Sequence, residues 1–121
     1  KDALAEPDVV VASSWGAAVA LKLLVDRVWT GPTVLLCPGH RRLLSSQDAD
    51  ALVVAFRALP KKTLRRVVLV HGTADATVPI ADSRELAAER ARLVEVPGGS
   101  HGLGGRWAAA RQACVRVGHK F

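Results

Sequence analysis

Short apolar runs alternate along the chain with longer stretches in which apolar residues recur at helical spacing. The apolar runs are rich in β-branched residues and predict strands at 8–13, 33–37, 67–70 and 93–96. The longer stretches predict helices at 15–28, from Ser45 or Ser46 to Leu59, at 81–92 and at 106–117. This alternation predicts an α/β fold, in which a parallel sheet of about four strands is flanked by helices.

Capping residues fix two of the predicted helix starts. Ser45 and Asp48 have the spacing of a capping box at the start of the second helix, and Asp82 and Glu85 have it near the start of the third. The remaining assignments are a polar loop at 40–47, a basic turn at 61–65, a glycine-rich loop at 97–105 and the end of a helix at 1–6.

The length of 121 residues suits a single domain, 1–121, and the 50% of apolar residues suits a packed core. No apolar run is long enough to span a bilayer, and the first residues lack the pattern of a signal peptide. Cys37 and Cys114 fall in different predicted elements, with no second pair for a disulfide framework. We therefore expect a cytoplasmic protein with reduced cysteines and no membrane contact. Because the sequence contains no methionine, we also expect that residues preceding Lys1 were trimmed or omitted.

A net charge of +6 leaves room for an acidic partner. The basic residues, however, are scattered singly or in doublets such as Arg41-Arg42 and Arg65-Arg66, and aromatic residues make up only 4% of the chain. Proteins that bind nucleic acid interleave basic runs with aromatic side chains. We therefore expect no nucleic-acid partner.

The first strand changes abruptly into a helix at a serine. Three valines precede Ala12, and an alanine-rich run follows Gly16, so Ser14 lies at the corner between the two elements. Small residues two positions before and two after the serine allow the helix to approach the strand closely, as in the nucleophile elbow usually written G-x-S-x-G. The alternative is an ordinary turn in which the serine caps the helix.

An acid and a histidine follow the third and fourth predicted strands. Asp75 comes shortly after the third strand and His101 comes after the fourth. In parallel sheets, ligands bind beyond the carboxyl ends of the strands, where both residues and Ser14 are expected. A serine nucleophile needs an imidazole to take its proton and a carboxylate to orient the imidazole. Asp75 could instead cap a turn before Val78, whereas a glycine-rich loop offers little to bury a structural histidine at 101.

Three motifs carry a resemblance to a known family. They are Ala12-Ser13-Ser14-Trp15-Gly16, His71-Gly72 followed by Asp75 and Val78-Pro79, and Gly98-Gly99-Ser100-His101. With these motifs the chain resembles the C-terminal two-thirds of an α/β-hydrolase of the serine hydrolase or esterase type, and the resemblance covers essentially the whole sequence. It implies a truncated or minimal α/β-hydrolase fold that lacks the usual N-terminal strands.

The resemblance also implies roles for individual residues. Ser14 would be the nucleophile, Asp75 the acid and His101 the base, and the backbone N–H of Trp15 would be one donor of the oxyanion hole. The family takes its second donor from an N-terminal loop that we expect to be absent here. The function expected is hydrolysis of small carboxylic esters or thioesters through an acyl-enzyme, without a cofactor. The alternative is a non-catalytic binding module or fragment that depends on a missing N-terminal part or a partner.

The other histidines and cysteines lack the spacings typical of metal ligands, so we expect no metal site. We interpret His71 as structural. For His40 and Cys37 a pocket lining and a plain loop remain equally open. Cys114 is expected in the core and His119 in a tail.

The predicted topology has a consequence for assembly. Right-handed crossovers place the three connecting helices on one face of the sheet, which leaves only the helix at 106–117 for the other face. We expect the first strand, at 9–11, to form an unpaired apolar edge, and an edge of this kind invites association. The sequence therefore predicts a homodimer or higher homo-oligomer that forms through the first strand and the uncovered face of the sheet.

Overall fold

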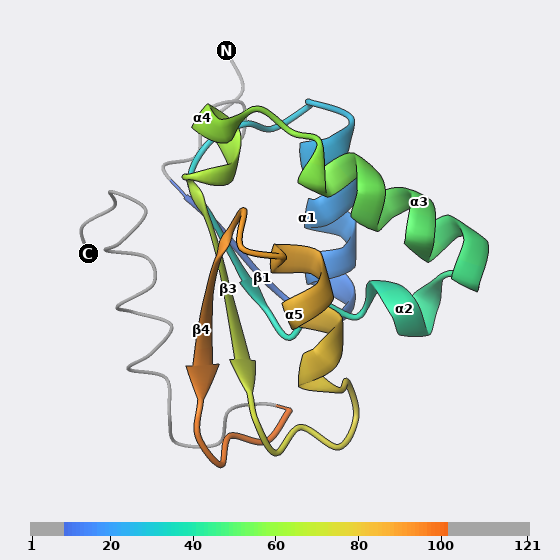
Figure 1. Ribbon diagram of the computed structural model, residues 1–121, viewed down its shortest axis with the longest axis vertical. Coiled ribbons are helices and arrows are strands. Elements are labelled where there is room, and N and C mark those ends of the chain that lie inside the picture. The colour runs from blue at the N-terminus through green and yellow to red at the C-terminus, as the bar shows by residue number, and fades with distance from the viewer. Residues whose placement is uncertain (1–8, 102–121) are drawn as a thin grey trace.

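The computed structural model describes residues 9–101, in which four strands alternate with five helices (Figure 1). All four strands run parallel, in the order β1-β2-β3-β4. The predicted α/β fold with a four-stranded parallel sheet is therefore confirmed. The elements are β1 (Val10–Ser13), α1 (Trp15–Val25), β2 (Thr33–Leu36), α2 (His40–Leu43), α3 (Ser46–Arg57), α4 (Lys61–Leu64), β3 (Val67–Gly72), α5 (Ile80–Ala87) and β4 (Arg92–Val96).

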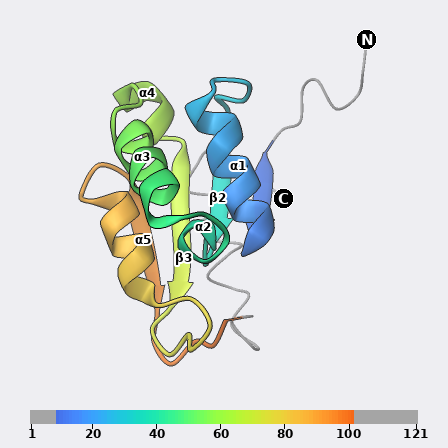
Figure 2. The same ribbon diagram turned by 90° about the vertical axis from the view of Figure 1, so that its right-hand side faces the viewer.

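One face of the sheet is covered by helices. Figures 1 and 2 show α1, α3 and α5 on the same side of the strands, as right-handed crossovers between consecutive strands require. Leu21 of α1, Phe56 of α3 and Leu86 of α5 pack there with Leu35 and Leu69 of the sheet, and all five are 0% exposed. This helix-side core holds the strands in register, so the loops at their carboxyl ends are built on a rigid base.

The opposite face of the sheet carries a second apolar cluster. Val34, Leu36, Val68, Val70 and Val96 alternate along their strands with the residues of the helix-side core, and all are buried. Every residue of β2 and β3 is buried, which explains why both strands read as continuous apolar runs. The helix expected at 106–117 and the helix end expected at 1–6 lie outside the described residues.

Several predicted boundaries are wrong because single residues take left-handed backbone conformations. The helix predicted at 15–28 ends at Val25, close to Arg27 with φ 59°. The strand predicted at 33–37 ends at Leu36, because Cys37 has φ 39°. The helix predicted at 81–92 ends at Ala87, because Ala88 and Glu89 have φ 44° and 65°. None of these residues is glycine, so the sequence carried no signal for the change.

One of the two capping predictions is confirmed and the other is wrong. Ser45 caps α3 as expected, because its Oγ accepts a hydrogen bond from the Asp48 N–H at 3.1 Å. The capping box predicted at Asp82 is wrong, since α5 already begins after Pro79. The predicted loop at 40–47 contains α2, and the predicted turn at 61–65 contains α4. Each of these helices is a single turn, which is too short for apolar periodicity to mark.

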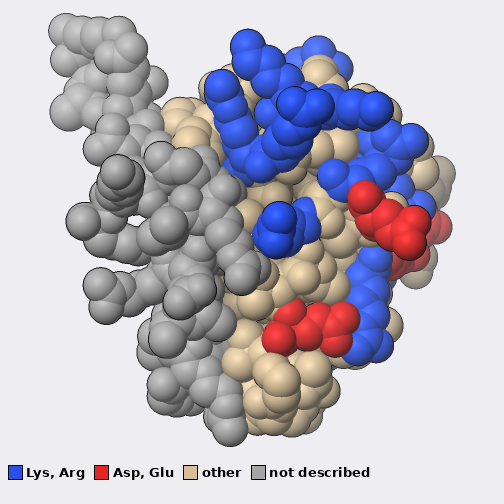
Figure 3. Space-filling model, turned by 60° about the vertical axis from the view of Figure 1, so that its left-hand side comes forward, with Lys and Arg blue, Asp and Glu red and all other residues tan. Residues whose placement is uncertain are grey.

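Within the described residues, no helix combines the length and the apolar character that crossing a membrane requires. Charged side chains are instead abundant on the surface. Figure 3 shows Lys and Arg gathered over the end of the molecule at which α4 lies. The strands begin at that end, and their carboxyl ends lie at the other.

Candidate active site

Ser14 occupies a strained corner between β1 and α1. Its backbone has φ 52° and ψ −111°, a combination that costs energy for a residue with a side chain. The corner is held because the Ser14 N–H donates to the Leu36 carbonyl at 2.9 Å. The Ser14 hydroxyl makes no capping hydrogen bond to α1, so it does not act as the helix cap that the sequence left open. A Cβ on Gly16 would lie 3.8 Å from the Ala12 Cβ, in line with the close approach expected there.

Asp75 lies in the loop after β3, and its side chain is fully buried. Its Oδ1 accepts hydrogen bonds from the backbone N–H of Thr77 at 2.9 Å and of Val78 at 2.8 Å. Its Oδ2 lies 2.8 Å from His101 Nδ1. Burial by itself raises the pKa of Asp75, but the hydrogen bonds from Val78, His101 and Thr77 lower it below the ordinary value. The carboxylate therefore stays ionised while it both caps its turn and faces His101.

His101 joins Asp75 to Ser14. Its Nδ1 is 2.8 Å from Asp75 Oδ2 and its Nε2 is 3.0 Å from Ser14 Oγ. Because an ionised carboxylate only accepts hydrogen bonds, Nδ1 carries the ring proton, which leaves the Nε2 lone pair facing the hydroxyl. The three residues singled out from the sequence thus lie in one hydrogen-bonded chain. Such a chain can move a proton from the hydroxyl to the imidazole.

Two glycines allow the loops of the acid and the histidine to meet. A Cβ on Gly72 would overlap the carbonyl group of Gly99, so only glycine fits at the end of β3. The Ala74 N–H donates to the Gly99 carbonyl at 3.0 Å, and the Gly98 N–H donates to Thr73 Oγ1 at 2.8 Å. These bonds hold the two loops together and so fix the distance between Asp75 and His101.

Cys37 lies at the carboxyl end of β2 and contacts the histidine loop. Its thiol donates to the His101 carbonyl at 3.1 Å. Burial, together with the charge of Asp75, raises the pKa of the thiol to about 11, although a backbone hydrogen bond at Ser14 opposes this. Cys37 therefore supports the site as a neutral thiol, and the alternative of a plain loop does not hold for it.

The loop after β2 also supports Ser14, which the sequence did not indicate. The Gly39 N–H donates to the Ser14 carbonyl at 3.0 Å, and a Cβ on Gly39 would lie only 3.4 Å from that carbonyl group. In the sequence Gly39 shows only as part of a Pro-Gly turn. His40, the next residue, is fully buried, and neither ring nitrogen has a hydrogen-bond partner among the described residues.

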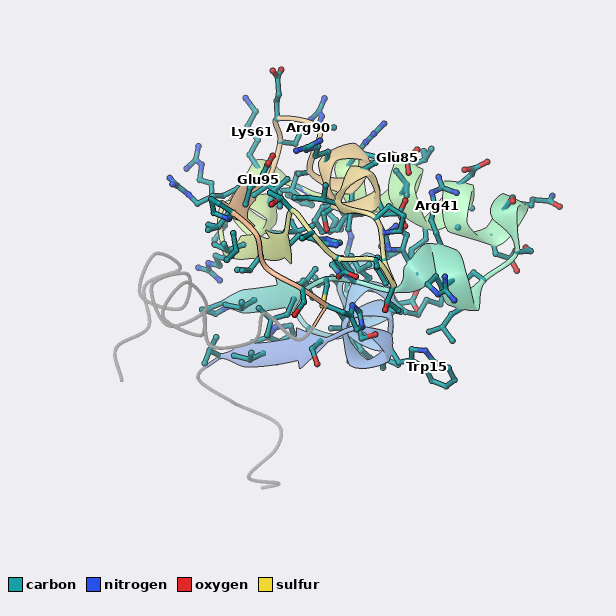
Figure 4. The ribbon with its side chains drawn as sticks, turned by 90° about the horizontal axis from the view of Figure 1, so that it is seen from below. Trp15, Arg41, Lys61, Glu85, Arg90 and Glu95 are labelled. Carbon is teal, nitrogen blue, oxygen red and sulfur yellow. The ribbon has the colours of Figure 1, made fainter. Side chains whose placement is uncertain are left out.

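Trp15 is the first residue of α1, so its backbone N–H has no acceptor within the helix. That N–H directly follows Ser14 in the chain. The Trp15 side chain is 69% exposed and points away from the sheet into solvent (Figure 4).

One set of side chains among residues 9–101 could converge on a metal ion. Cys37, Asp75 and His101 each place a donor atom within 4.8 Å of the others. Sulfur, oxygen and nitrogen donors suit Zn²⁺. The carboxylate and the ring already make the contacts with each other and with Ser14, so a metal would compete with those contacts. The expectation that the chain uses no metal stays a prediction.

Comparisons with known proteins place this geometry in context. No protein-family model and no curated protein matches the sequence. Among solved structures, the chain is similar to the 2-hydroxy-6-oxo-6-phenylhexa-2,4-dienoate hydrolase (BphD) from Rhodococcus sp. strain RHA1, with a TM-score of 0.61 and 19% sequence identity. The similarity covers 93% of this chain and 64% of the hydrolase, so the chain spans less than two thirds of that protein's length. At this identity the comparison shows the fold alone, and that fold is the fold of the α/β-hydrolases.

Proposed function

We propose that this chain is a serine hydrolase that cleaves small carboxylic esters or thioesters through an acyl-enzyme. The observation that carries the proposal is the hydrogen-bonded chain from Ser14 through His101 to Asp75, with distances of 3.0 Å and 2.8 Å. A buried carboxylate, a half-buried imidazole and a serine on a strained corner form the arrangement that serine nucleophiles require.

In the proposed reaction the Ser14 hydroxyl attacks the carbonyl carbon of the ester. His101 Nε2 takes the hydroxyl proton as the bond forms, and Asp75 stabilises the resulting imidazolium through Nδ1. The imidazolium then gives its proton to the departing alcohol or thiol, which leaves an acyl group on Ser14. A water molecule then attacks the acyl carbon while His101 Nε2 takes its proton. The ring returns that proton to Ser14 Oγ as the bond to the acyl group breaks, which releases the acid and restores the serine.

The negative charge that develops on the carbonyl oxygen needs hydrogen-bond donors. We propose that the backbone N–H of Trp15, which has no acceptor within α1, is one of them, because it directly follows the nucleophile at the start of that helix. Loss of one donor costs about 10²–10³ in rate in enzymes of this type. If the chain spans only part of a longer hydrolase, the remainder could supply a second donor, and the activity of the chain alone would then be correspondingly low.

Two further observations support the choice of reaction and substrate. The structural neighbour is by its name a hydrolase, which supports hydrolysis in general. Among the described residues, Trp15 beside Ser14 is exposed, and the segment that follows Gly39 forms only the single turn of α2. So little covering structure next to Ser14 favours small or exposed acyl groups over long chains that need an enclosed tunnel.

The test is hydrolysis of p-nitrophenyl acetate, p-nitrophenyl octanoate and S-acetylthiocholine by the purified chain. We expect Ser14→Ala to lower kcat to background, a loss on the order of 10⁶-fold for a fully active enzyme of this class. Ser13→Ala is the matched control, because Ser13 is the exposed neighbour on β1 and should leave turnover unchanged. Equal turnover by wild type and Ser14→Ala would reject the proposal and favour the alternative of a non-catalytic binding module.

A further inference from the structure

The sequence indicates a structural role for His71, yet both of its ring nitrogens make contacts that lead to the site. The residue lies near the end of β3 and is 0% exposed. Nε2 lies 2.7 Å from the Val78 carbonyl oxygen, and Nδ1 lies 2.6 Å from Ser83 Oγ on α5. Because a carbonyl oxygen only accepts, Nε2 carries a proton and donates it to Val78. The buried Ser83 hydroxyl lies within hydrogen-bond distance of Nδ1, so each ring nitrogen has a partner.

The same Nε2 lies 3.3 Å from Asp75 Oδ2. That oxygen is also the one that faces His101 Nδ1 at 2.8 Å. A single carboxylate oxygen therefore lies between the N–H groups of two imidazole rings. Of the two rings, His71 is farther from Oδ2. Its Nε2 proton therefore points mainly at the Val78 carbonyl oxygen, while the Nε2–H group still lies near the carboxylate.

His71 also holds the backbone that holds Asp75. The Val78 N–H donates to Asp75 Oδ1 at 2.8 Å, and the Val78 carbonyl accepts from His71 at 2.7 Å. The peptide group before Val78 is thus held by the Asp75 carboxylate, and the peptide group after it is held by the His71 ring. If His71 were removed, the turn would keep its bonds to Oδ1, but the side of the carboxylate facing His101 would lose its second contact.

We infer that His71 is a positioning residue, which holds the Asp75 carboxylate so that Oδ2 stays aimed at His101 Nδ1. The inference rests on the proposed function, and it deepens that proposal by adding a residue that acts through Asp75 rather than on the substrate. Ser83 contributes to the same positioning, because its contact with Nδ1 holds the His71 ring in place.

The kinetic test compares His71→Leu with His71→Gln. Gln carries an amide N–H close to the position of Nε2, whereas Leu fills the space without a donor. We expect His71→Leu to lower kcat about 10- to 100-fold with little change in KM, because misplacing a catalytic group is costly even over short distances. His71→Gln should recover most of the rate. An unchanged kcat for folded His71→Leu would overturn the inference.

A double-mutant cycle with Asp75→Ala separates positioning from packing. If His71 acts through Asp75, His71→Leu has no further effect on kcat once Asp75 is Ala. A packing role predicts instead that His71→Leu lowers kcat by the same factor in both backgrounds, which would contradict the inference.

A spectroscopic readout works without turnover. In ¹H–¹⁵N spectra of the histidine rings, the proton on His101 Nδ1 should give a low-field signal in the wild type and in His71→Gln, and this signal should be lost in His71→Leu. Its persistence in folded His71→Leu would overturn the inference. If His71→Leu does not fold, Ser83→Ala takes its place. We expect this variant to weaken the signal and to lower kcat about three- to tenfold. An unaltered signal and an unaltered rate in Ser83→Ala would count against the inference. A wild type without Ser14-dependent turnover would refute the proposed function, while this signal would still decide whether His71 places Asp75.

Discussion

His101 Nε2 lies 3.0 Å from Ser14 Oγ although 87 positions separate the two residues in the chain. Ser14 follows the first strand of the sheet and His101 follows the fourth, so the contact reaches across all four carboxyl ends. Asp75, after the third strand, closes the chain of contacts. The geometry of the site therefore depends on all four strands, and on the contacts that hold the loop after each strand in place.

Asp75→Asn should lower kcat less than Ser14→Ala does, by a margin of about 10². The amide can still accept from Thr77 and Val78 through its oxygen, but it then presents an NH₂ group to His101 Nδ1 in place of an acceptor. The ring is pushed toward the wrong tautomer, whereas the nucleophile remains. Steady-state kinetics with p-nitrophenyl acetate measures the difference. Equal rates for Asp75→Asn and wild type would show that the carboxylate does not orient His101.

Cys37→Ala should reduce kcat about three- to tenfold, because the loop of His101 loses one hydrogen bond at its carbonyl group. Cys37→Ser keeps a donor and should be less affected. The thiol pKa of about 11 also predicts slow alkylation. In a Cys114→Ser background, iodoacetamide at pH 7.5 should modify Cys37 at least about 10²-fold more slowly than a free thiol. Rapid modification at that pH would contradict the buried, neutral thiol.

His40 should make the fold sensitive to mild acid. Burial lowers the pKa of its ring; Asp82 and Glu85 oppose this and Arg41 adds to it. The unfolded chain takes up a proton near the ordinary value of about 6.5, whereas the folded chain does not, so the free energy of unfolding falls as the pH drops below about 6.5. This loss continues until the pH reaches the lowered pKa of the folded state.

His40→Leu should remove most of this dependence and raise the free energy of unfolding by about 1–3 kcal/mol at pH 5, since it also removes two buried nitrogens that have no partner within residues 9–101. Urea unfolding at pH 7.5, 6 and 5 measures the effect. Arg42→Leu, an exposed change on the same helix, is the control. An equal fall in stability for wild type and His40→Leu would contradict the account.

We propose that copies of this chain associate through the edge formed by β1. Within the described residues β1 is the first strand of the sheet, and Val11 on it is 49% exposed. Val11→Lys should therefore give a smaller species in light scattering. Val10 is unsuitable for this test, because it packs against the helix-side core. Val54→Lys, on the exposed side of α3, is the control and should leave the assembly unchanged. A monomeric wild type at micromolar concentration would contradict the proposal.

Site residues that lie next to a strand end in the sequence are predictable from the sequence. Ser14, Asp75 and His101 each follow an apolar run directly or within a few residues, and parallel strands bring their carboxyl ends to one edge. Ser45 was found for a similar reason, because a cap and its partner lie three positions apart. Features of this kind can be predicted because they depend only on residues that are close together in the sequence.

Contacts between residues that only the tertiary structure brings together could not be predicted from the sequence. The partner of the Cys37 thiol lies 64 positions away, and His71 bonds to Ser83 across the space between β3 and α5. Nothing in the spacing of these residues distinguishes a structural histidine from one that faces Asp75. The end of α5 was mispredicted for a different reason, since Ala88 takes a left-handed conformation that alanine seldom adopts.

The most direct measurement of the central claim is where, and how fast, a fluorophosphonate reacts with the chain. If Ser14 is a nucleophile activated by His101, mass spectrometry of the wild type should find a single adduct on the Ser14 hydroxyl. Ser14→Ala should take up no label, Ser13→Ala should label at the wild-type rate, and His101→Ala should label at least about 10³-fold more slowly. A wild type that takes up no label, or a label that persists unchanged in Ser14→Ala, would contradict the account.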